Sequence, residues 1–145
     1  MITIKRITYA DLPDLCQLYN ELIGRDTNYS KLEGVFKSIQ YNDNYIILGA
    51  FNGEDLVGSL MGIICHDLVG ECKPFMVIEN VIVSPHVRRQ GVGAKLMQEI
   101  EMIARERDCY YMIFVSGEQR KEAHVFYEKL GFKEEKVEGY RKHFY

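Results

Sequence analysis

Residues 77–94 read VIENVIVSPHVRRQGVGA, and this stretch predicts a strand, a tight turn and the start of a helix. Residues 76–83 are mostly apolar and β-branched, which suits a buried strand. Ser84-Pro85 ends that strand because proline offers no N–H to the ladder. Residues 91–107 then follow a helical period, with an apolar face made of Val92, Leu96, Met97, Ile100, Ile103 and Ala104.

Two glycines, Gly91 and Gly93, stand at the start of this predicted helix, next to Arg88 and Arg89. The first N–H groups of a helix have no partner inside the helix, and the helix dipole makes that end positive. Because glycine has no Cβ, an anion can approach these amides closely, and the arginines add positive charge. The pattern predicts a cradle for a phosphate or a diphosphate.

The glycine pattern taken alone leaves other readings open. A Walker loop needs Gly-Lys-Ser/Thr, but Gly93 is followed by Ala94-Lys95-Leu96. A dinucleotide fingerprint needs a third glycine where this chain has Leu96. The two glycines are equally compatible with a plain turn between a strand and a helix.

A second motif lies at residues 122–132, which read EAHVFYEKLGF. The pattern Arg88-x-x-Gly91-x-Gly93-Ala94, behind a strand that ends at Val83, and this second motif resemble the two signatures of the GNAT superfamily of acetyl-CoA-dependent N-acetyltransferases. The resemblance covers about residues 75–133. It implies a single α/β (α+β) domain over residues 1–145, with a mixed central sheet of about six or seven strands and about four helices. Two strands would splay apart at the acyl-CoA site.

The bulk composition fits one globular domain. The chain has 145 residues, of which 47% are hydrophobic and 27% are charged. The formal net charge of −3 argues against a nucleic-acid partner, which usually requires a basic excess. No apolar run is long enough to span a bilayer, and the first residues lack the apolar region of a signal peptide. We therefore expect no membrane partner.

The four cysteines, Cys16, Cys65, Cys72 and Cys109, are scattered, with no Cys-x-x-Cys pair and no histidine at metal-binding spacing. We expect free thiols, a cytoplasmic protein and no metal. A redox or nucleophilic role for a cysteine remains the alternative to simple packing.

The chain before the motif alternates helical and strand patterns. The second predicted helix has a weak apolar stripe of Leu32, Val35, Phe36 and Ile39. In the GNAT architecture this region would border the acceptor pocket. The expected elements are a strand at 2–7, a helix from Asp11 to Gly24, a helix near 29–39, and strands at 45–51 and 56–65 that are joined at Asn52-Gly53.

The chain after the motif completes a βαβ unit, which we expect to be right-handed. Residues 110–115 form an apolar run typical of a strand that is buried on both faces. The remaining expected elements are a helix at about 119–130 with Gly131 as its C′ residue, a strand from Phe132, and a last strand at 140–145.

Glu79 is the candidate general base. By strand alternation it shares a face with Val77, Val81 and Val83, and these apolar neighbours would remove water from its carboxylate. A carboxylate that points into a wet cleft and only balances charge is the alternative. In GNAT enzymes an acidic residue at this place often takes the proton of the amine, usually through water.

Tyr127 is the candidate general acid. It shares a predicted helix face with Ala123, Phe126 and Leu130, so a packed core tyrosine is the alternative reading. The resemblance implies that Tyr127 protonates the thiolate of coenzyme A. The ordinary pKa values of a phenol and a thiol, about 10 and about 8.5, make that donation chemically sensible.

The resemblance also implies a set of cofactor contacts. GNAT enzymes often have an asparagine seven residues before the tyrosine, but this chain has Arg120 there, followed by Lys121. His124 lies one turn before Tyr127 and is most simply a surface residue. The expected acetyl-CoA contacts are Val81, Ile82, Val83, Arg88, Arg89, Gln90, Gly91, Val92, Gly93, Ala94, Arg120, Phe126 and Lys129.

The implied reaction is direct transfer of an acetyl group from acetyl-CoA to a primary amine of a small molecule. Residues 79–83, 108–110 and 126–129 are also similar to glucosamine-phosphate N-acetyltransferases, which gives one alternative acceptor. A peptide or protein amine is another, and a non-catalytic acyl-CoA-binding module is a third reading. A homodimer is also expected, because the aromatic strand at 140–145 would be an edge able to pair with a second copy.

Overall fold

The computed structural model describes residues 1–87, 89–115, 125, 127–132 and 135–145. The chain forms two compact units, Met1–Ile113 and Phe114–Tyr145. That the two together form one domain stays a prediction.

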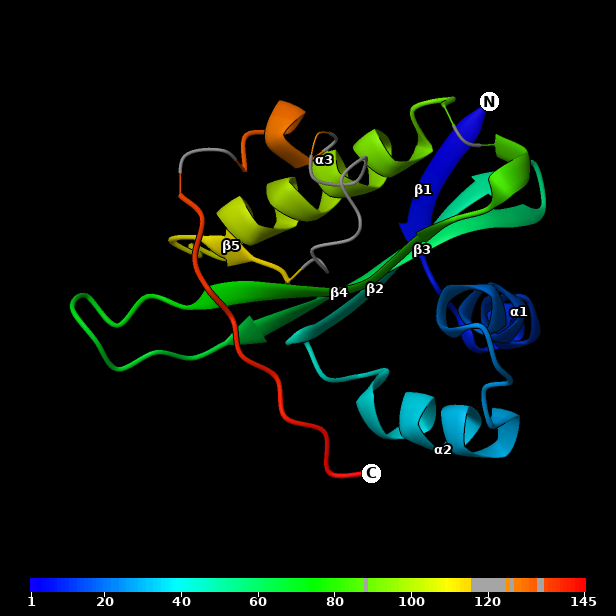
Figure 1. The fold of residues 1–145 in the computed structure, drawn as a ribbon, viewed down its shortest axis with the longest axis horizontal. Coiled ribbons are helices and arrows are strands. Elements are labelled where there is room, and N and C mark those ends of the chain that lie inside the picture. The colour runs from blue at the N-terminus through cyan, green and yellow to red at the C-terminus, as the bar shows by residue number, and fades with distance from the viewer. Residues whose placement is uncertain (88, 116–124, 126, 133–134) are drawn as a thin grey trace. The chain divides into compact units, whose positions relative to one another are not determined.

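A five-stranded sheet with the strand order β1-β2-β3-β4-β5 forms the first unit (Figure 1). Strands β1 to β4 pair antiparallel, and β5 pairs parallel to β4. The parallel pair confirms the predicted βαβ unit, and the mixed sheet with helices on both faces confirms the predicted α/β class. The strands are β1 (Ile2–Arg6), β2 (Tyr45–Asn52), β3 (Asp55–Cys65), β4 (Phe75–Val83) and β5 (Met112–Ile113).

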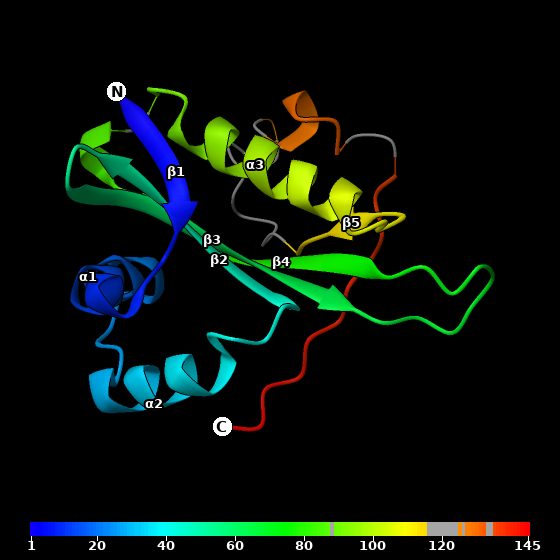
Figure 2. The same ribbon diagram turned by 180° about the vertical axis from the view of Figure 1, so that it is seen from behind.

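Helices cover both faces of this sheet. Helix α3 (Val92–Glu106) lies on one face, and α1 (Leu12–Ile23) and α2 (Tyr29–Ile39) lie on the other, as the two opposite views in Figures 1 and 2 show. Helix α1 follows a short 3-10 turn, η1 (Tyr9–Asp11), and ends at Gly24, whose φ of 69° is the left-handed conformation expected at C′. These helices confirm the sequence predictions.

Two glycines of β3 let α3 approach the sheet closely. A Cβ at Gly58 would lie 3.1 Å from Val92 Cγ1, and one at Gly62 would lie 2.8 Å from Ile100 Cδ1. The buried face of α3 packs over these positions, and Val92, Leu96 and Ile100 are almost fully buried. Because Val92 is the first residue of α3, this contact fixes the start of the helix above β3 and β4.

A second apolar cluster lies on the α1 face of the sheet. Ile7, Leu12, Leu15, Phe36 and Phe51 form its buried part, and Tyr19 packs against it. Within α2 only Phe36 is fully buried, and Val35 is 58% exposed. The predicted four-residue stripe of α2 is therefore wrong at Val35, because this helix has a narrower contact with the molecule than its sequence period suggests.

The predicted strand at 110–115 is much shorter in the structure. Strand β5 has only two residues, and its register with β4 is Met76↔Met112 and Val77↔Ile113. Tyr110 is 54% exposed and Val115 is 69% exposed, so burial on both faces was a wrong prediction. An apolar run alone does not show how far a strand pairs.

The second unit contains the end of a helix. Val125 and Tyr127–Lys129 are helical. The N–H of Gly131 donates to the carbonyl of Glu128, and the N–H of Phe132 donates to the carbonyl of Tyr127, both at 3.1 Å. With φ of 97° at Gly131, this is the hydrogen-bond pattern of a Schellman motif, which confirms Gly131 as C′.

The strands predicted after this helix are not found among the described residues, and positions 133–134 of the first predicted strand lie outside them. Residues 135–145 contain no strand, so neither the strand from Phe132 nor the one at 140–145 forms among the described residues. The part of the chain that the structure describes contributes five strands to the sheet, where about six or seven were expected. The edge proposed for a homodimer is absent with them, and the homodimer itself stays a prediction.

No helix in the described parts of the chain is long and apolar enough to cross a membrane.

Candidate functional site

The segment after β4 is anchored to the sheet by Ser84. Its N–H donates to the carbonyl of Val57 at 2.8 Å, and its own carbonyl accepts from the N–H of Val87 at 3.1 Å. The Ser84 hydroxyl accepts from the N–H of His86 at 3.5 Å. These bonds wind residues Pro85–Val87 into a 3-10 turn, η2, whose Val87 is buried. The chain therefore leaves the sheet in a fixed direction toward α3.

The predicted anion cradle begins after this turn. Arg89 has φ of 69° and Gly91 has φ of 76°, so two left-handed residues stand on either side of Gln90. Alternation of left- and right-handed residues turns successive N–H groups toward a common concavity, which is an arrangement that binds anions. Gly91 is the N-cap of α3, and its carbonyl accepts the first helical bond, from the N–H of Lys95 at 3.0 Å.

Position 91 favours glycine because its backbone is left-handed, and not because a side chain would lack space. A Cβ at Gly91 would meet nothing within 4 Å, so the space around it is open. Open space at a helix N-terminus also leaves room for a ligand. The N–H groups of Val92, Gly93 and Ala94 lie in the first turn, where no carbonyl of the same helix can reach them. Arg89 and Gln90 are exposed beside them, and Arg88 lies outside the described residues.

A bulge interrupts β4 at Asn80. Glu79 pairs with Met61 and Ile82 pairs with Ser59, so three steps along β4 match two steps along β3. Asn80 has φ of 57°, the left-handed conformation that accommodates such an extra residue.

The bulge changes which N–H groups of β4 face β3. The N–H of Met76 points away from β3, because it donates to the carbonyl of Tyr111 at 3.0 Å. The N–H of Ser84 points toward β3, because it donates to Val57. Successive N–H groups of a strand point to opposite edges, so those of Val81 and Val83 point away from β3, toward the β5 edge. Among the described residues β5 pairs only with Met76 and Val77, so Val81 and Val83 lie beyond the end of that ladder.

The expected surroundings of Glu79 are wrong in two respects. Val83 pairs with Gly58 and Glu79 pairs with Met61, and these two partners lie on opposite faces of β3, so Val83 does not share the face of Glu79. The bulge moves Val81 to the other face in the same way. Glu79 is also exposed, so the apolar burial expected from its valine neighbours does not occur. The role of Glu79 as a general base stays a prediction. It depends on contact between the carboxylate and water, and not on burial among apolar side chains.

Asn80 of β4 has Tyr19 of α1 as a neighbour that the sequence did not indicate. Burial raises the pKa of Tyr19 to about 12, and the nearby side chain of Asn80 opposes that rise. Tyr19 and Asn80 are 61 positions apart in the sequence, so no spacing pattern could connect them.

Tyr127 lies in the second unit, in an aromatic cluster. It is 7% exposed, and its ring centroid lies 4.0 Å from that of Phe114 and 6.3 Å from that of Phe132. The packed ring agrees with the expected core face of the helix, while the role of the hydroxyl as an acid stays a prediction. Because Glu79 belongs to the first unit, joint action of the two residues is also a prediction.

Some of the remaining predicted acetyl-CoA contacts are described by the structure, and the others are not. Ile82 is buried and paired with Ser59, so it supports the strand from within, and Lys129 is exposed. Arg88, Arg120, His124 and Phe126 lie outside the described residues.

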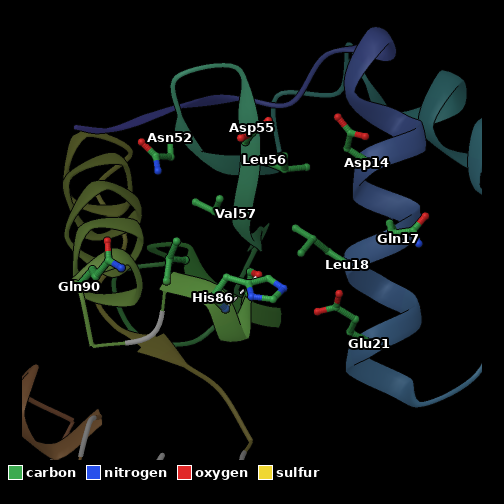
Figure 3. Close-up of a pocket in the computed structure, with 12 residues that line it drawn as sticks. Asp14, Gln17, Leu18, Glu21, Asn52, Asp55, Leu56, Val57, His86 and Gln90 are labelled. Carbon is green, nitrogen blue, oxygen red and sulfur yellow. Dashed lines mark hydrogen bonds between the residues drawn. The ribbon is translucent and has the colours of Figure 1, made fainter.

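A cleft of about 570 Å³ opens next to the cradle, between α1, the β2–β3 hairpin and the segment after β4 (Figure 3). Carboxylates from Asp14, Glu21 and Asp55 line it, together with the imidazole of His86, and none of the described lining residues is Lys or Arg. Gln90 belongs to both the cleft and the cradle segment. No local sequence pattern predicts this cleft, because its walls come from three distant segments. The other lining residues are Gln17, Leu18, Asn52, Leu56, Val57, Ser84 and Val87.

The cysteines and histidines form no metal site among the residues described, where no group of three or more metal-binding side chains occurs. All four cysteines are free thiols, as predicted. Partial burial raises the pKa of the Cys109 thiol, which disfavours the reactive thiolate and supports a packing role for this residue.

Comparison with known proteins gives a family match over most of the chain. The profile of the Acetyltransferase (GNAT) family matches residues 12–132, which include both the cradle and Tyr127.

Three similar proteins illustrate the match. The aminoglycoside N(6')-acetyltransferase type 1 of Acinetobacter genomosp. 13 is 23% identical over 126 residues, which is 85% of this chain and 86% of that protein. The glucosamine 6-phosphate N-acetyltransferase of Trypanosoma brucei brucei is 41% identical over 56 residues, and the chain spans only 36% of its length. The crystal structure of glucosamine-6-phosphate N-acetyltransferase from Arabidopsis thaliana superposes with a TM-score of 0.86 at 21% identity, covering 99% of each chain.

Proposed function

Because this chain belongs to the Acetyltransferase (GNAT) family, we propose that it moves an acetyl group from acetyl-CoA to a primary amine of a small molecule. Its enzyme class, an acyltransferase, follows from the family. The observation that carries the proposal is the pairing, on one continuous segment, of the anion cradle at Arg89–Gly91 with the bulge at Asn80.

The cradle accounts for binding of the diphosphate of coenzyme A. The N–H groups at the start of α3 and the positive end of the helix dipole stabilise negative charge. Gly91 leaves the approach to them open, and Arg89 adds a guanidinium at the exposed rim. Acetyl-CoA fits this donor set because its diphosphate supplies the negative charge that such a site binds.

The strand after the bulge accounts for holding the thioester. The N–H groups of Val81 and Val83 point to the same edge of β4, where a peptide-like pantetheine chain can accept hydrogen bonds from them as a neighbouring strand would. An N–H aimed at the thioester carbonyl also stabilises the negative charge that develops on its oxygen when the amine attacks. This geometry requires the bulge, because an unbroken strand would direct both groups into the β3 ladder.

The two proton transfers are assigned to Glu79 and Tyr127. The amine nitrogen forms a bond to the carbonyl carbon while the carbon–sulfur bond breaks, and Glu79 takes the proton of the amine directly or through a water. Its exposure makes the route through water the natural one. Tyr127 donates a proton to the leaving sulfur. Such positioned acids and bases typically contribute about 10²- to 10⁴-fold each.

The charge of the cleft favours a cationic acceptor. Three carboxylates line it without a lysine or arginine among the described lining residues, so an amine with several ammonium groups would be attracted, and a sugar phosphate would be repelled. We therefore place aminoglycosides and polyamines ahead of glucosamine 6-phosphate and peptide amines as acceptors. The similarity to both kinds of small-molecule acetyltransferase is compatible with this order.

A thiol-release assay tests the function. The protein is mixed with acetyl-CoA and, in separate wells, an aminoglycoside, a polyamine, glucosamine 6-phosphate or a lysine-containing peptide, and free coenzyme A is measured with a thiol reagent. Release above the background rate with a cationic amine supports the proposal. Binding of acetyl-CoA in calorimetry without thiol release from any acceptor would instead support a non-catalytic acyl-CoA-binding module.

A further inference from the structure

Two regions that prefer opposite charges lie side by side after β4. The cradle at Arg89–Gly91 presents N–H groups that favour an anion. The adjoining cleft presents carboxylates instead, from Asp14, Glu21 and Asp55. Gln90 lines the cleft and also stands between the two left-handed residues of the cradle, so the two regions share one segment. An empty cleft therefore repels the diphosphate that the cradle attracts.

The carboxylates of the cleft have no counter-charge in the described part of the chain. None of the three forms an ion pair or a hydrogen bond with another described residue, and all three are exposed to solvent. Asp14 and Glu21 lie along one side of α1 (Figure 3), and their spacing of seven positions separates them by about 10 Å along the helix axis. A molecule with two ammonium groups can therefore contact both.

Ser84 is a second, independent sign of a ligand in the cleft. It lines the cleft and is only 8% exposed. Its hydroxyl oxygen accepts from the N–H of His86, but the hydroxyl hydrogen has no acceptor among the described residues. Buried polar groups of folded proteins normally have a partner, and an oxygen atom of a bound molecule would supply it. An amine that also carries a hydroxyl group matches both the carboxylates and Ser84.

We propose that the cleft and the cradle bind their ligands cooperatively. An amine with two ammonium groups in the cleft neutralises its carboxylates, and this strengthens binding of the diphosphate of coenzyme A in the cradle. Coupling between two sites is reciprocal, so bound coenzyme A strengthens binding of the amine by the same factor. The cleft therefore does more than select a cationic acceptor. This inference rests on the proposed function, which assigns the acceptor to the cleft and coenzyme A to the cradle.

Calorimetry with coenzyme A tests the coupling without chemistry, because this ligand has no acetyl group to transfer. The Kd is measured alone, with 1,3-diamino-2-propanol, which carries two ammonium groups and one hydroxyl, and with sodium chloride at the same ionic strength. We expect the diamine to lower the Kd for coenzyme A about five- to tenfold. Sodium chloride should not lower it, because salt only screens the charges. In about 1 M salt, where the Debye length is about 3 Å, the effect of the diamine should disappear.

Neutral variants of the cleft should bind coenzyme A more tightly. The triple variant Asp14→Asn/Glu21→Gln/Asp55→Asn removes the charge of the cleft, and it should fold because all three side chains are exposed. Without amine, its Kd for coenzyme A should be about five- to tenfold lower than that of the unmodified protein, and the diamine should no longer change it. Glu21→Gln alone should give part of this effect. Glu106→Gln, which removes the same charge at the opposite end of α3, should give none.

The outcomes separate this inference from the proposed function. Weaker binding of coenzyme A by the triple variant, or a diamine effect no greater than that of sodium chloride, would overturn the inference. Acetyl transfer to any amine in the thiol-release assay would still support the proposed function in that case. Coupled binding without thiol release from any acceptor would reject acetyl transfer and leave the coupling in place. The absence of heat with coenzyme A under every condition would overturn both.

Discussion

Glu79 and Val83 lie on opposite faces of β4, although four positions separate them and a regular strand would place them on the same face. The cause is the left-handed Asn80 between them. One residue thus separates a strand segment that presents Glu79 to solvent from a segment whose N–H groups point to the β5 edge. We propose that the base, Glu79, and the N–H groups that bind the thioester lie on the two sides of this bulge.

Replacing Gly91 by alanine tests the cradle. An alanine would strain the φ of 76° without meeting any neighbour, so we expect a loss of about 1 kcal/mol in the free energy of unfolding. Relief of that strain would rotate the N–H groups that face the diphosphate, and the Kd for coenzyme A should rise about tenfold. Urea unfolding and calorimetry measure the two effects.

Gly24→Ala is the matched control for this change. Gly24 has φ of 69°, also with nothing within 4 Å of a Cβ, but it ends α1. The control should lose a similar free energy of unfolding and keep its affinity for coenzyme A. Equal affinity in both variants would show that the conformation of Gly91 is unrelated to binding.

Glu79→Gln tests the base. The amide keeps the size of the side chain and cannot accept the proton, so kcat should fall about 10²-fold or more while the Kd for acetyl-CoA stays the same. The fold should be unaffected because Glu79 is exposed. Glu106→Gln, at the end of α3, is the control and should be fully active. Full activity in Glu79→Gln would remove this residue from the mechanism.

Tyr127→Phe tests the acid. The phenylalanine ring keeps the contacts with Phe114 and Phe132, so the Tm should change by only a few degrees. Turnover should fall about 10²-fold with acetyl-CoA affinity nearly intact, because the substitution removes the proton donor for the leaving sulfur. Single-turnover kinetics and calorimetry make the comparison. If turnover equals that of the unmodified protein, the hydroxyl is not the acid.

Tyr19 should make stability depend on alkaline pH. Burial places its pKa at about 12 in the folded state, against 10.0 for an unperturbed tyrosine. A pKa raised on folding means that the folded state holds the proton more tightly. The associated stability is therefore complete below pH 10 and is lost as the pH rises from 10 through 12.

The difference between Tyr19→Phe and the unmodified protein isolates this effect. Over that pH range the unmodified protein should lose up to about 2 kcal/mol more free energy of unfolding than the variant, because phenylalanine does not ionise. Urea unfolding at several pH values measures the difference. Parallel curves for the two proteins would contradict the burial of the hydroxyl.

The elements with strong local signals were predictable from the sequence. Helix α2 begins and ends where its period indicated, and Gly24, Gly91 and Gly131 adopt the left-handed conformations typical of helix termini. The bulge was not predictable, since asparagine in a β-branched run gives no sign of the φ it adopts. Strand alternation consequently failed for Glu79.

Features that depend on distant segments were also missed. The proximity of Tyr19 to Asn80 and the acidic cleft each combine side chains from separate elements, so no local pattern reports them. The apolar run at 110–115 and the aromatic end at 140–145 suggested strands, but strand formation requires a partner with unused hydrogen-bonding groups. Apolar composition does not specify that partner.

The central claim is that the N–H groups after Arg89 bind the diphosphate of coenzyme A. Calorimetric titration with coenzyme A and, separately, with pantetheine, which lacks the diphosphate, tests it most directly. Binding of coenzyme A should be at least about tenfold tighter than that of pantetheine, and Arg89→Glu should remove most of this difference. Equal affinity for the two ligands, or no heat with coenzyme A, would contradict the claim.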